Sequence, residues 1–231
     1  MGRSRAVVTS GPTRARLDAV RFLMNTSSGS LGAAIADQGL ARGWEVGLVH
    51  GPCSTLPPPH PNLSTHPVSW LSDLYPTLLG VPYREEIAVV FHAMAVLDWA
   101  PRTVSQGKRA SGRPWRVVLD PTPKIIDELR GLFPNAALIA FKLETGVTEE
   151  ELVARAGRLA RRCGADIVVA NLLEWVQAGY RCRVVCGDGS VRADIVGREE
   201  TAAWLWGWVE NRRMSLPVRE NGPRKAGDRY P

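Results

Sequence analysis

Small hydroxyl and glycine residues lie at the start of a predicted helix near the N-terminus, where they could bind an anion. The apolar stretch 6–10 predicts a strand, and the pattern of 29–42 predicts a helix. Backbone N–H groups in the first turn of a helix have no acceptor inside the helix, and they attract anions. The sequence therefore predicts an anion site at Ser27, Ser28, Gly29 and Gly32. Helix capping and close packing against a sheet explain the same residues equally well.

The loop between this strand and this helix is long. It runs for about 18 residues, whereas the connection in a dinucleotide-binding unit has about 2–6. In addition, none of the tyrosines is followed four residues later by lysine. A short-chain, NAD(P)-dependent reductase is therefore a disfavoured alternative.

The rest of the sequence alternates strand and helix patterns, which is typical of α/β proteins. Strands are predicted at 6–10, 45–50, 87–93, 136–142 and 165–171, and helices at 29–42, 71–79, 123–132, 148–163 and 198–212. The first four strand segments are short and almost continuously apolar, as expected of a parallel sheet covered on both faces. Gly187-Asp188-Gly189 separates two further strand-like stretches, 180–185 and 191–196, and predicts a hairpin. We therefore predict an α/β fold with a Rossmann-like, mostly parallel sheet, helices on both faces and an antiparallel edge hairpin.

Two segments interrupt the alternation. Residues 51–68 are rich in proline and are predicted to form an extended surface loop. Residues 99–122 hold glycines and prolines around a strand-like stretch from Trp115 to Leu119, and they are predicted to leave the sheet as a flap. The polar, basic residues 214–231 are predicted to be a disordered tail, so that residues 1–213 form one domain.

Composition limits the classes of partner. The chain of 231 residues has a net charge of +6, with 25 arginines and 4 lysines, which suits phosphorylated small molecules. Nucleic-acid binding is judged unlikely, because the basic residues are spread along the chain. No stretch approaches the ~20 apolar residues of a membrane span, and no signal peptide is evident. The four cysteines lack a Cys-x-x-Cys pair and the four histidines lack ligand spacing, so we expect buried, reduced thiols, no protein-held metal and a cytoplasmic location.

Several motifs occur in the order of one known family. They are Thr9-Ser10-Gly11-Pro12-Thr13, Asp18-Ala19-Val20-Arg21-Phe22, Asn25-x-Ser27-Ser28-Gly29-x-x-Gly32, Ala93-Met94-Ala95-Val96-Leu97-Asp98, Lys108, Phe141-Lys142-Leu143-Glu144-Thr145 and Val168-Val169-Ala170-Asn171. On these residues the chain resembles the phosphopantothenoylcysteine synthetase (phosphopantothenate–cysteine ligase) family over about residues 6–175. The Phe141–Thr145 version is similar to the stand-alone synthetases, so we expect no fused decarboxylase.

The resemblance implies a ligase of coenzyme A biosynthesis that joins 4'-phosphopantothenate to L-cysteine. A nucleoside triphosphate, ATP or CTP, would activate the carboxylate as an acyl-nucleotide, with Mg²⁺ held mainly by the phosphates. The family is commonly dimeric, so a homodimer is expected. Three tryptophans in the segment 198–212 cannot share one helix face, and we expect some of them to contact a second subunit: Trp204, Trp206 and Trp208.

Two catalytic residues follow from the resemblance. Asn25 would hold the pantothenate carboxylate and govern conversion of the acyl-nucleotide, although a turn or capping asparagine is the alternative. Lys108 would stabilise the charge that develops during acyl-nucleotide formation, although an exposed loop lysine is the alternative.

The resemblance also implies binding residues. The substrate or phosphate site would contain Arg21 with the residues of the helix start. Nucleotide would contact Gly11, Ala95, Asp98, Lys124, Phe141, Lys142 and Arg158. A strand-end role for Asp98, a core position for Phe141 and a solvated face for Arg158 remain alternatives, and Arg155, Arg161 and Arg162 compete with Arg158.

The chain departs from the family at two places. Met94 replaces the usual alanine, and Arg109-Ala110-Ser111 replaces a lysine-rich run after Lys108. These departures favour the alternative of a catalytically weakened homologue that binds nucleotides or phosphorylated metabolites.

Overall fold

A computed structural model describes residues 4–215 of the chain. An eight-stranded sheet crosses the molecule in the order β12-β11-β10-β9-β6-β1-β4-β5. Its parallel strands are β1 (Arg5–Ser10), β4 (Glu45–His50), β5 (Leu63–Pro67), β6 (Ile87–His92), β9 (Ala137–Glu144) and β10 (Ile167–Leu172). The antiparallel edge is formed by β11 (Arg181–Val185) and β12 (Val191–Val196).

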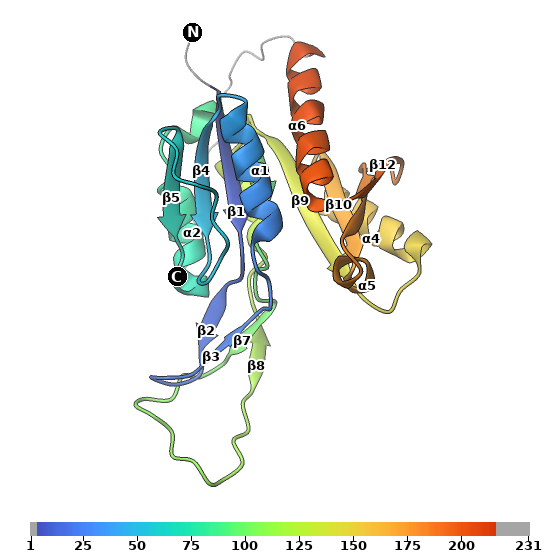
Figure 1. Ribbon diagram of the computed structural model, residues 1–231. Coiled ribbons are helices and arrows are strands. Elements are labelled where there is room, and N and C mark those ends of the chain that lie inside the picture. Colours follow the sequence, from blue (N-terminus) through green and yellow to red (C-terminus); the bar gives the residue numbers. More distant parts are fainter. Residues whose placement is uncertain (1–3, 216–231) are drawn as a thin grey trace.

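Helices cover both faces of the sheet (Figure 1). They are α1 (Ser30–Ala41), α2 (Leu71–Leu79), α3 (Ile125–Leu132), α4 (Glu149–Cys163), α5 (Leu173–Gln177) and α6 (Arg198–Ser215), with a 3-10 turn at η1 (Arg84–Glu86). One core lies between the sheet and α2, α3 and α4, and a second core lies between the sheet and α1 and α6. The predicted α/β class, with its parallel sheet and antiparallel edge, is confirmed.

The central strands are buried because apolar residues face both cores. Val7 and Val90 point into the first core, whereas Val8 and Phe91 point into the second, as the alternation of a strand requires. All four side chains are fully buried. This burial on both faces explains the continuous apolar runs in the sequence.

Helix α4 shows how local sequence fixes an element. The Thr148 hydroxyl accepts a hydrogen bond from the backbone N–H of Glu151 and caps the first turn. Acidic residues occupy that turn, arginines occupy the last turn, and Gly164 ends the helix in a left-handed conformation. The prediction of a helix at 148–163 therefore agrees with the structure to within one residue.

Strand β5 corrects the prediction that 51–68 is only a surface loop. Residues 63–67 pair in parallel with β4 and form the free edge of the sheet. Pro67 ends this strand, at an edge where a missing N–H costs no ladder hydrogen bond. The prolines of the preceding segment therefore did not exclude a strand.

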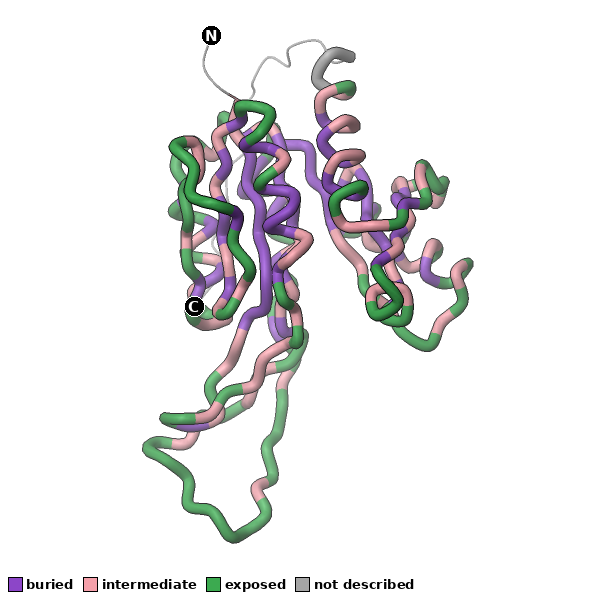
Figure 2. The backbone as a smooth tube through the Cα atoms, viewed as in Figure 1, coloured by how far each residue is buried: buried purple, intermediate pink, exposed green. Residues whose placement is uncertain are grey.

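Two small hairpins form a projection that we call the arm. It consists of β2 (Arg14–Arg16) with β3 (Phe22–Met24), and β7 (Trp99–Pro101) with β8 (Leu119–Pro121), together with the loops that join each pair. Figure 1 shows the arm extending beyond the sheet, and Figure 2 shows that its residues are mostly exposed or half-buried. The predicted flap is therefore one half of the arm, and the other half lies in the long loop before α1.

The predicted strand from Trp115 to Leu119 is wrong in its position. Regular pairing begins only at Leu119, opposite Pro101, and residues 115–118 have no strand conformation. A single backbone hydrogen bond, from Arg102 N–H to the Val118 carbonyl (2.9 Å), precedes the ladder. The apolar pattern of this stretch thus reflects its place on the arm and not membership of the main sheet.

Helix α6 packs against α1 through its tryptophans. Trp206 is fully buried, lies 4.8 Å from Trp44 and 5.0 Å from Phe91 between ring centres, and donates from Nε1 to the Ile35 carbonyl (2.7 Å). Trp204 and Trp208 are half-buried against the same core. The chain's own core thus accounts for Trp206, and the expectation that some of the three tryptophans contact a second subunit stays a prediction.

The end of the chain is described only in part. Helix α6 continues to Ser215, and the predicted disordered tail from residue 216 onward lies outside the described residues. The predicted domain boundary at residue 213 therefore stays a prediction. None of the described helices is long and apolar enough to cross a membrane.

The cysteines are not uniformly buried. Cys163 and Cys182 lie in the cores, Cys186 is half-buried and Cys53 is exposed, and no two of them form a disulfide. The expectation of buried cysteines is therefore met by Cys163 and Cys182 and is wrong for Cys53.

Candidate functional site

A cavity of about 960 Å³ lies over the carboxyl ends of the parallel strands. The chain runs from β1 to β4 on one side and later continues from β6 to β9 on the other side, so the order reverses between β1 and β6. Loops at such a reversal diverge and leave a crevice for ligands. The first turn of α1, the segment after β6, the end of β9 and the exposed face of α4 all line this cavity.

The cavity is strongly basic. Among the described residues that line it, Asp98 alone is acidic, whereas six are basic: Lys124, Lys142, Arg155, Arg158, Arg162 and Arg198. Such an excess raises the local concentration of anions. The lining therefore suits a ligand with more than one negative charge.

The first turn of α1 contributes backbone donors. Gly29 caps this helix in a left-handed conformation (φ +75°), and its carbonyl accepts a hydrogen bond from the Ser10 hydroxyl (3.0 Å). A Cβ at Gly32 would lie 2.2 Å from the Ser10 oxygen, so only glycine permits this close approach to β1. Among the described residues, the N–H groups of Leu31 and Gly32 have no acceptor. Both residues line the cavity, as do the predicted residues Ser27 and Ser28.

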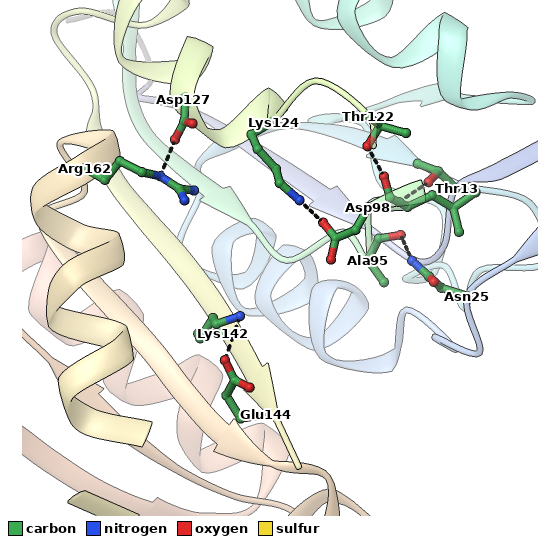
Figure 3. A network of polar contacts seen from close by, with 11 residues as sticks. Thr13, Asn25, Ala95, Asp98, Thr122, Lys124, Asp127, Lys142, Glu144 and Arg162 are labelled. Carbon is green, nitrogen blue, oxygen red and sulfur yellow. Dashed lines mark hydrogen bonds and ion pairs between the residues drawn. The ribbon is translucent and has the colours of Figure 1, made fainter. Parts of the chain in front are cut away.

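Asn25 joins this loop to the segment after β6. Its side-chain nitrogen donates to the Ala95 carbonyl (2.9 Å), and both residues line the cavity (Figure 3). A carbonyl only accepts hydrogen bonds, so the amide must present nitrogen to Ala95. Asn25 is not the cap of α1, because Gly29 takes that position. One amide hydrogen and the side-chain oxygen of Asn25 are left for a ligand.

Charged residues on the other side of the cavity are mostly paired. Lys124 contacts Asp98, and Lys142 lies 2.9 Å from Glu144 (Figure 3). The competing residues Arg155 and Arg162 pair with acidic side chains, Arg155 with Glu144 and Glu151 and Arg162 with Asp127. Arg158, the predicted residue, is exposed and has no ion pair among the described residues. Among the α4 arginines that line the cavity, Arg158 is therefore the one that a ligand can bind without displacing a carboxylate.

Two further residues of the family motifs, Phe141 and Met94, line this cavity. Phe141 is half-buried, packs against the second core and also lines the cavity. Its contact with a nucleotide stays a prediction. Met94 contributes to the cavity lining but is only 6% exposed, and its side chain belongs to the first core. Its extra bulk relative to alanine is therefore mostly accommodated below the cavity.

Three predicted site residues lie outside the lining of this cavity: Gly11, Arg21 and Lys108. Gly11 has a φ of +76°, and a Cβ there would collide with Ser54, so its role in the structure is close packing of loops. Lys108 is exposed on the arm loop. The structure therefore does not bring Lys108 and Asn25 together within one chain.

Arg21 is held on the arm by Asp18. The Asp18 side chain is fully buried and accepts hydrogen bonds from backbone N–H groups of both arm segments and from the Arg21 guanidinium (2.5 Å). Burial raises the pKa of the Asp18 carboxyl, but these hydrogen bonds outweigh burial and lower the pKa to about 2. The Asp18-to-Phe22 motif thus fixes the arm hairpin to the loop that carries Lys108.

Among the lining residues that sequence reasoning missed are His92 and Arg198. His92 closes β6, and Arg198 opens α6 with its guanidinium 5.1 Å from the centre of the Tyr180 ring. Arg198 has no ion pair among the described residues. Arg198 lies far from the motifs in the sequence, so no motif indicated that it belongs to the site. His92 directly precedes the Ala93–Asp98 motif, and this position could have indicated it.

The doubly wound sheet and the basic cavity at its strand reversal define an α/β protein of the kind typical of small-molecule binding. A family model described as the DNA/pantothenate metabolism flavoprotein C-terminal domain matches residues 1–186. The chain belongs to this family, and the family relationship predicted from the sequence motifs is thereby confirmed.

Curated relatives agree with this assignment. The coenzyme A biosynthesis bifunctional protein CoaBC of Thermococcus kodakarensis is 36% identical over 208 residues, which cover 89% of this chain and 51% of that protein. The chain thus spans about half the length of this relative, and 41% of the CoaBC protein of Bacillus subtilis, which is 33% identical.

Solved structures share the fold. The DNA/pantothenate metabolism flavoprotein of Streptococcus pneumoniae superposes with a TM-score of 0.82 at 28% identity, covering 91% of this chain and all of that chain. A mutant of Cab2, solved in complex with phosphopantothenate-cysteine, has a TM-score of 0.75 at 20% identity and covers 92% of this chain and 87% of its own. The likeness to Cab2 concerns the fold alone.

Proposed function

We propose that this protein is a phosphopantothenate–cysteine ligase that uses ATP or CTP in coenzyme A biosynthesis. The observation that carries the proposal is one cavity in which an asparagine amide, free helix N–H groups and six basic side chains converge. Family membership and the CoaBC relatives support it. The Cab2 mutant that was solved in complex with phosphopantothenate-cysteine shares the fold.

In the proposed reaction, a carboxylate oxygen of 4'-phosphopantothenate attacks the α-phosphorus of the nucleotide. The bond from that phosphorus to the bridging oxygen breaks, and pyrophosphate leaves. The cysteine amine then attacks the acyl carbon, loses a proton and displaces the nucleoside monophosphate. Both steps depend on positioning and on donors directed at oxygens that gain charge.

The chain's own residues suit separate parts of this task. Asn25 would hold the pantothenate carboxylate with its free amide hydrogen, next to the N–H groups at the start of α1. Lys124, Lys142 and Arg158 would face the nucleotide phosphates from α3, β9 and α4. Mg²⁺ would be bound mainly through those phosphates, with Asp98 as the carboxylate within the lining.

Lys108 would act from the arm. Because it lies outside the cavity lining, its proposed role requires the arm loop to move over a cavity, either its own or that of a second copy. Exposed apolar residues on the arm support a homodimer through this region: Val20, Phe22, Trp99, Val104, Val118 and Leu119, with exposed fractions from 38% to 59%. We also propose a cytoplasmic location.

Pyrophosphate release tests the proposal directly. Purified protein with phosphopantothenate, L-cysteine and Mg²⁺ should release pyrophosphate with ATP or with CTP, and the comparison identifies the preferred nucleotide. Release should require phosphopantothenate. If neither nucleotide supports release while both bind, the protein is the weakened binding homologue instead.

Two variants separate the proposed catalytic roles. Rapid-quench measurements on Asn25→Ala should show the acyl-nucleotide accumulating, because its conversion is impaired. Lys108→Ala should fail to form the acyl-nucleotide, with a loss of roughly 100-fold or more, similar to removal of a preorganised donor. Equal amounts of intermediate in the two variants would contradict the assignment.

A further inference from the structure

His92 is a buried histidine in the cavity wall that the proposed mechanism does not yet use. It is the last residue of β6 and is 7% exposed, and it lies beside Thr9 on β1 at the point where the strand order reverses. Its Nδ1 atom lies 2.8 Å from the Thr9 hydroxyl. Among the described residues, Nε2 has no hydrogen-bond partner, and His92 lines the cavity.

The hydrogen bonds around Thr9 fix the tautomer of this ring. The Thr9 oxygen accepts from the backbone N–H of Met94 (3.3 Å), and the hydroxyl hydrogen has His92 Nδ1 as its acceptor among the described residues. With Nδ1 as that acceptor, Nδ1 is unprotonated and the ring proton lies on Nε2, which is the tautomer that we infer for His92. Burial lowers the pKa of His92 to about 4, which keeps the ring neutral near pH 7.

The direction of the side chain indicates which ligand it faces. Side chains alternate along β6, so His92 projects to the same face as Val90, toward the core under α2, α3 and α4. The basic residues of the cavity on this side are Lys124 directly before α3, Lys142 on β9 and three arginines of α4: Arg155, Arg158 and Arg162. The start of α1 lies on the opposite face, with the second core.

We propose that His92 is a neutral hydrogen-bond donor whose Nε2–H binds a phosphoryl oxygen of the nucleotide. A neutral donor adds a directed contact to a site already rich in charge, and it does not need to lose a proton when the phosphate binds. Thr9 is the positioning residue that holds the ring in this tautomer. This inference rests on the proposed function, because it assigns a residue to the nucleotide half of the same cavity.

Nuclear magnetic resonance of ¹⁵N-labelled histidine tests the tautomer without any turnover. In the free protein near pH 7, His92 should show a protonated Nε2 and an unprotonated Nδ1. A non-hydrolysable nucleotide analogue should shift the Nε2–H resonance, whereas phosphopantothenate alone should not. A proton on Nδ1, or a shift caused by phosphopantothenate and not by the analogue, would overturn the inference.

Two pairs of variants test the contact and its positioning. His92→Leu should weaken binding of the analogue by about tenfold or more, as expected for a lost hydrogen bond to a charged group. His92→Gln keeps an N–H near the Nε2 position and should stay within about threefold of wild type. Thr9→Val removes the hydroxyl, so the spectrum should no longer show His92 only in the form with the proton on Nε2. Thr9→Ser keeps the hydroxyl and should keep that form.

The controls separate this inference from the proposed function. Phosphopantothenate affinity and the thermal midpoint show whether a variant is folded. If the wild-type protein binds no nucleotide, the proposed function fails. If the wild type binds nucleotide and His92→Leu binds it equally well, or if the Leu and Gln variants lose affinity equally, only the role of His92 fails.

Discussion

At the scale of single residues, hydrogen bonds inside the protein decide which atoms remain for a ligand. Asn25 uses one amide hydrogen on the Ala95 carbonyl, and His92 uses Nδ1 on the Thr9 hydroxyl. Each side chain is thereby held in one orientation, with its remaining donor still available. Such pre-organisation lowers the entropy that binding must overcome.

The depressed pKa of His92 predicts how stability changes with pH. The unfolded ring binds a proton near pH 6.5, whereas the folded ring does so only near pH 4. Between these values the unfolded state binds more protons, so the free energy of unfolding falls as the pH decreases, by on the order of 3 kcal/mol at most. Below about pH 4 this contribution is constant.

Urea denaturation across this pH window measures the effect. His92→Gln carries no titrating group, so its free energy of unfolding should decline less steeply than that of wild type as the pH is lowered. Parallel declines for the two proteins would show that other groups cause the pH dependence.

At the scale of elements, α1 and α6 bring their N-termini to the same end of the sheet. Their contact depends on Gly39, where a Cβ would lie 2.4 Å from the ring of Trp206. Since Trp206 also packs on Trp44 and Phe91, the ring has little freedom to move aside. This packing sets the position of Arg198 at the cavity as well as the stability of the second core.

Gly39→Ala should therefore destabilise the protein by about 1–3 kcal/mol through overpacking, although alanine favours helices. Gly131→Ala is the matched control, because a Cβ at Gly131 in α3 meets no atom within 4 Å. It should be neutral or stabilising by up to ~1 kcal/mol. Thermal or chemical denaturation of both variants tests this, and equal effects at the two sites would contradict the packing argument.

At the scale of the whole molecule, the arm is built differently from the sheet. Its strands have three residues each, and its apolar side chains are exposed rather than buried. Arg14 and Arg16 stack on Trp70 at 4.2 and 3.7 Å from the ring centre and fasten the base of the arm to α2. Hairpins this short are only marginally stable on their own.

If the arm joins two copies, a charge on it should separate them. Val118 is 58% exposed on the arm, and Val118→Arg should shift the sedimentation mass from about twice 25.3 kDa toward the mass of one chain. Val196→Arg is the control, because Val196 is 68% exposed on β12, at the far edge of the sheet from the arm. A monomeric wild type, or dissociation by the control as well, would contradict a dimer through the arm.

Much of the fold and part of the site follow from sequence. Apolar runs placed the central strands, and the helix pattern at 71–79 coincides with α2. The anion site at Ser27–Gly32 follows from residue types at a helix start, and its residues do line the cavity. These features are local, since a few neighbouring residues determine the hydrogen bonds and the buried face.

The sequence by itself determined the α/β class, the family and the first turn of α1. Only the tertiary structure decided that β5 joins the sheet, that Asn25 meets Ala95 and that Lys108 stands apart on the arm. It also decided that Thr9 orients His92, which is 83 residues away. The physical reason is that strand pairing and side-chain contacts join segments far apart in the chain. The periodicity of apolar residues indicates local helices and strands, but it does not indicate which distant segments meet.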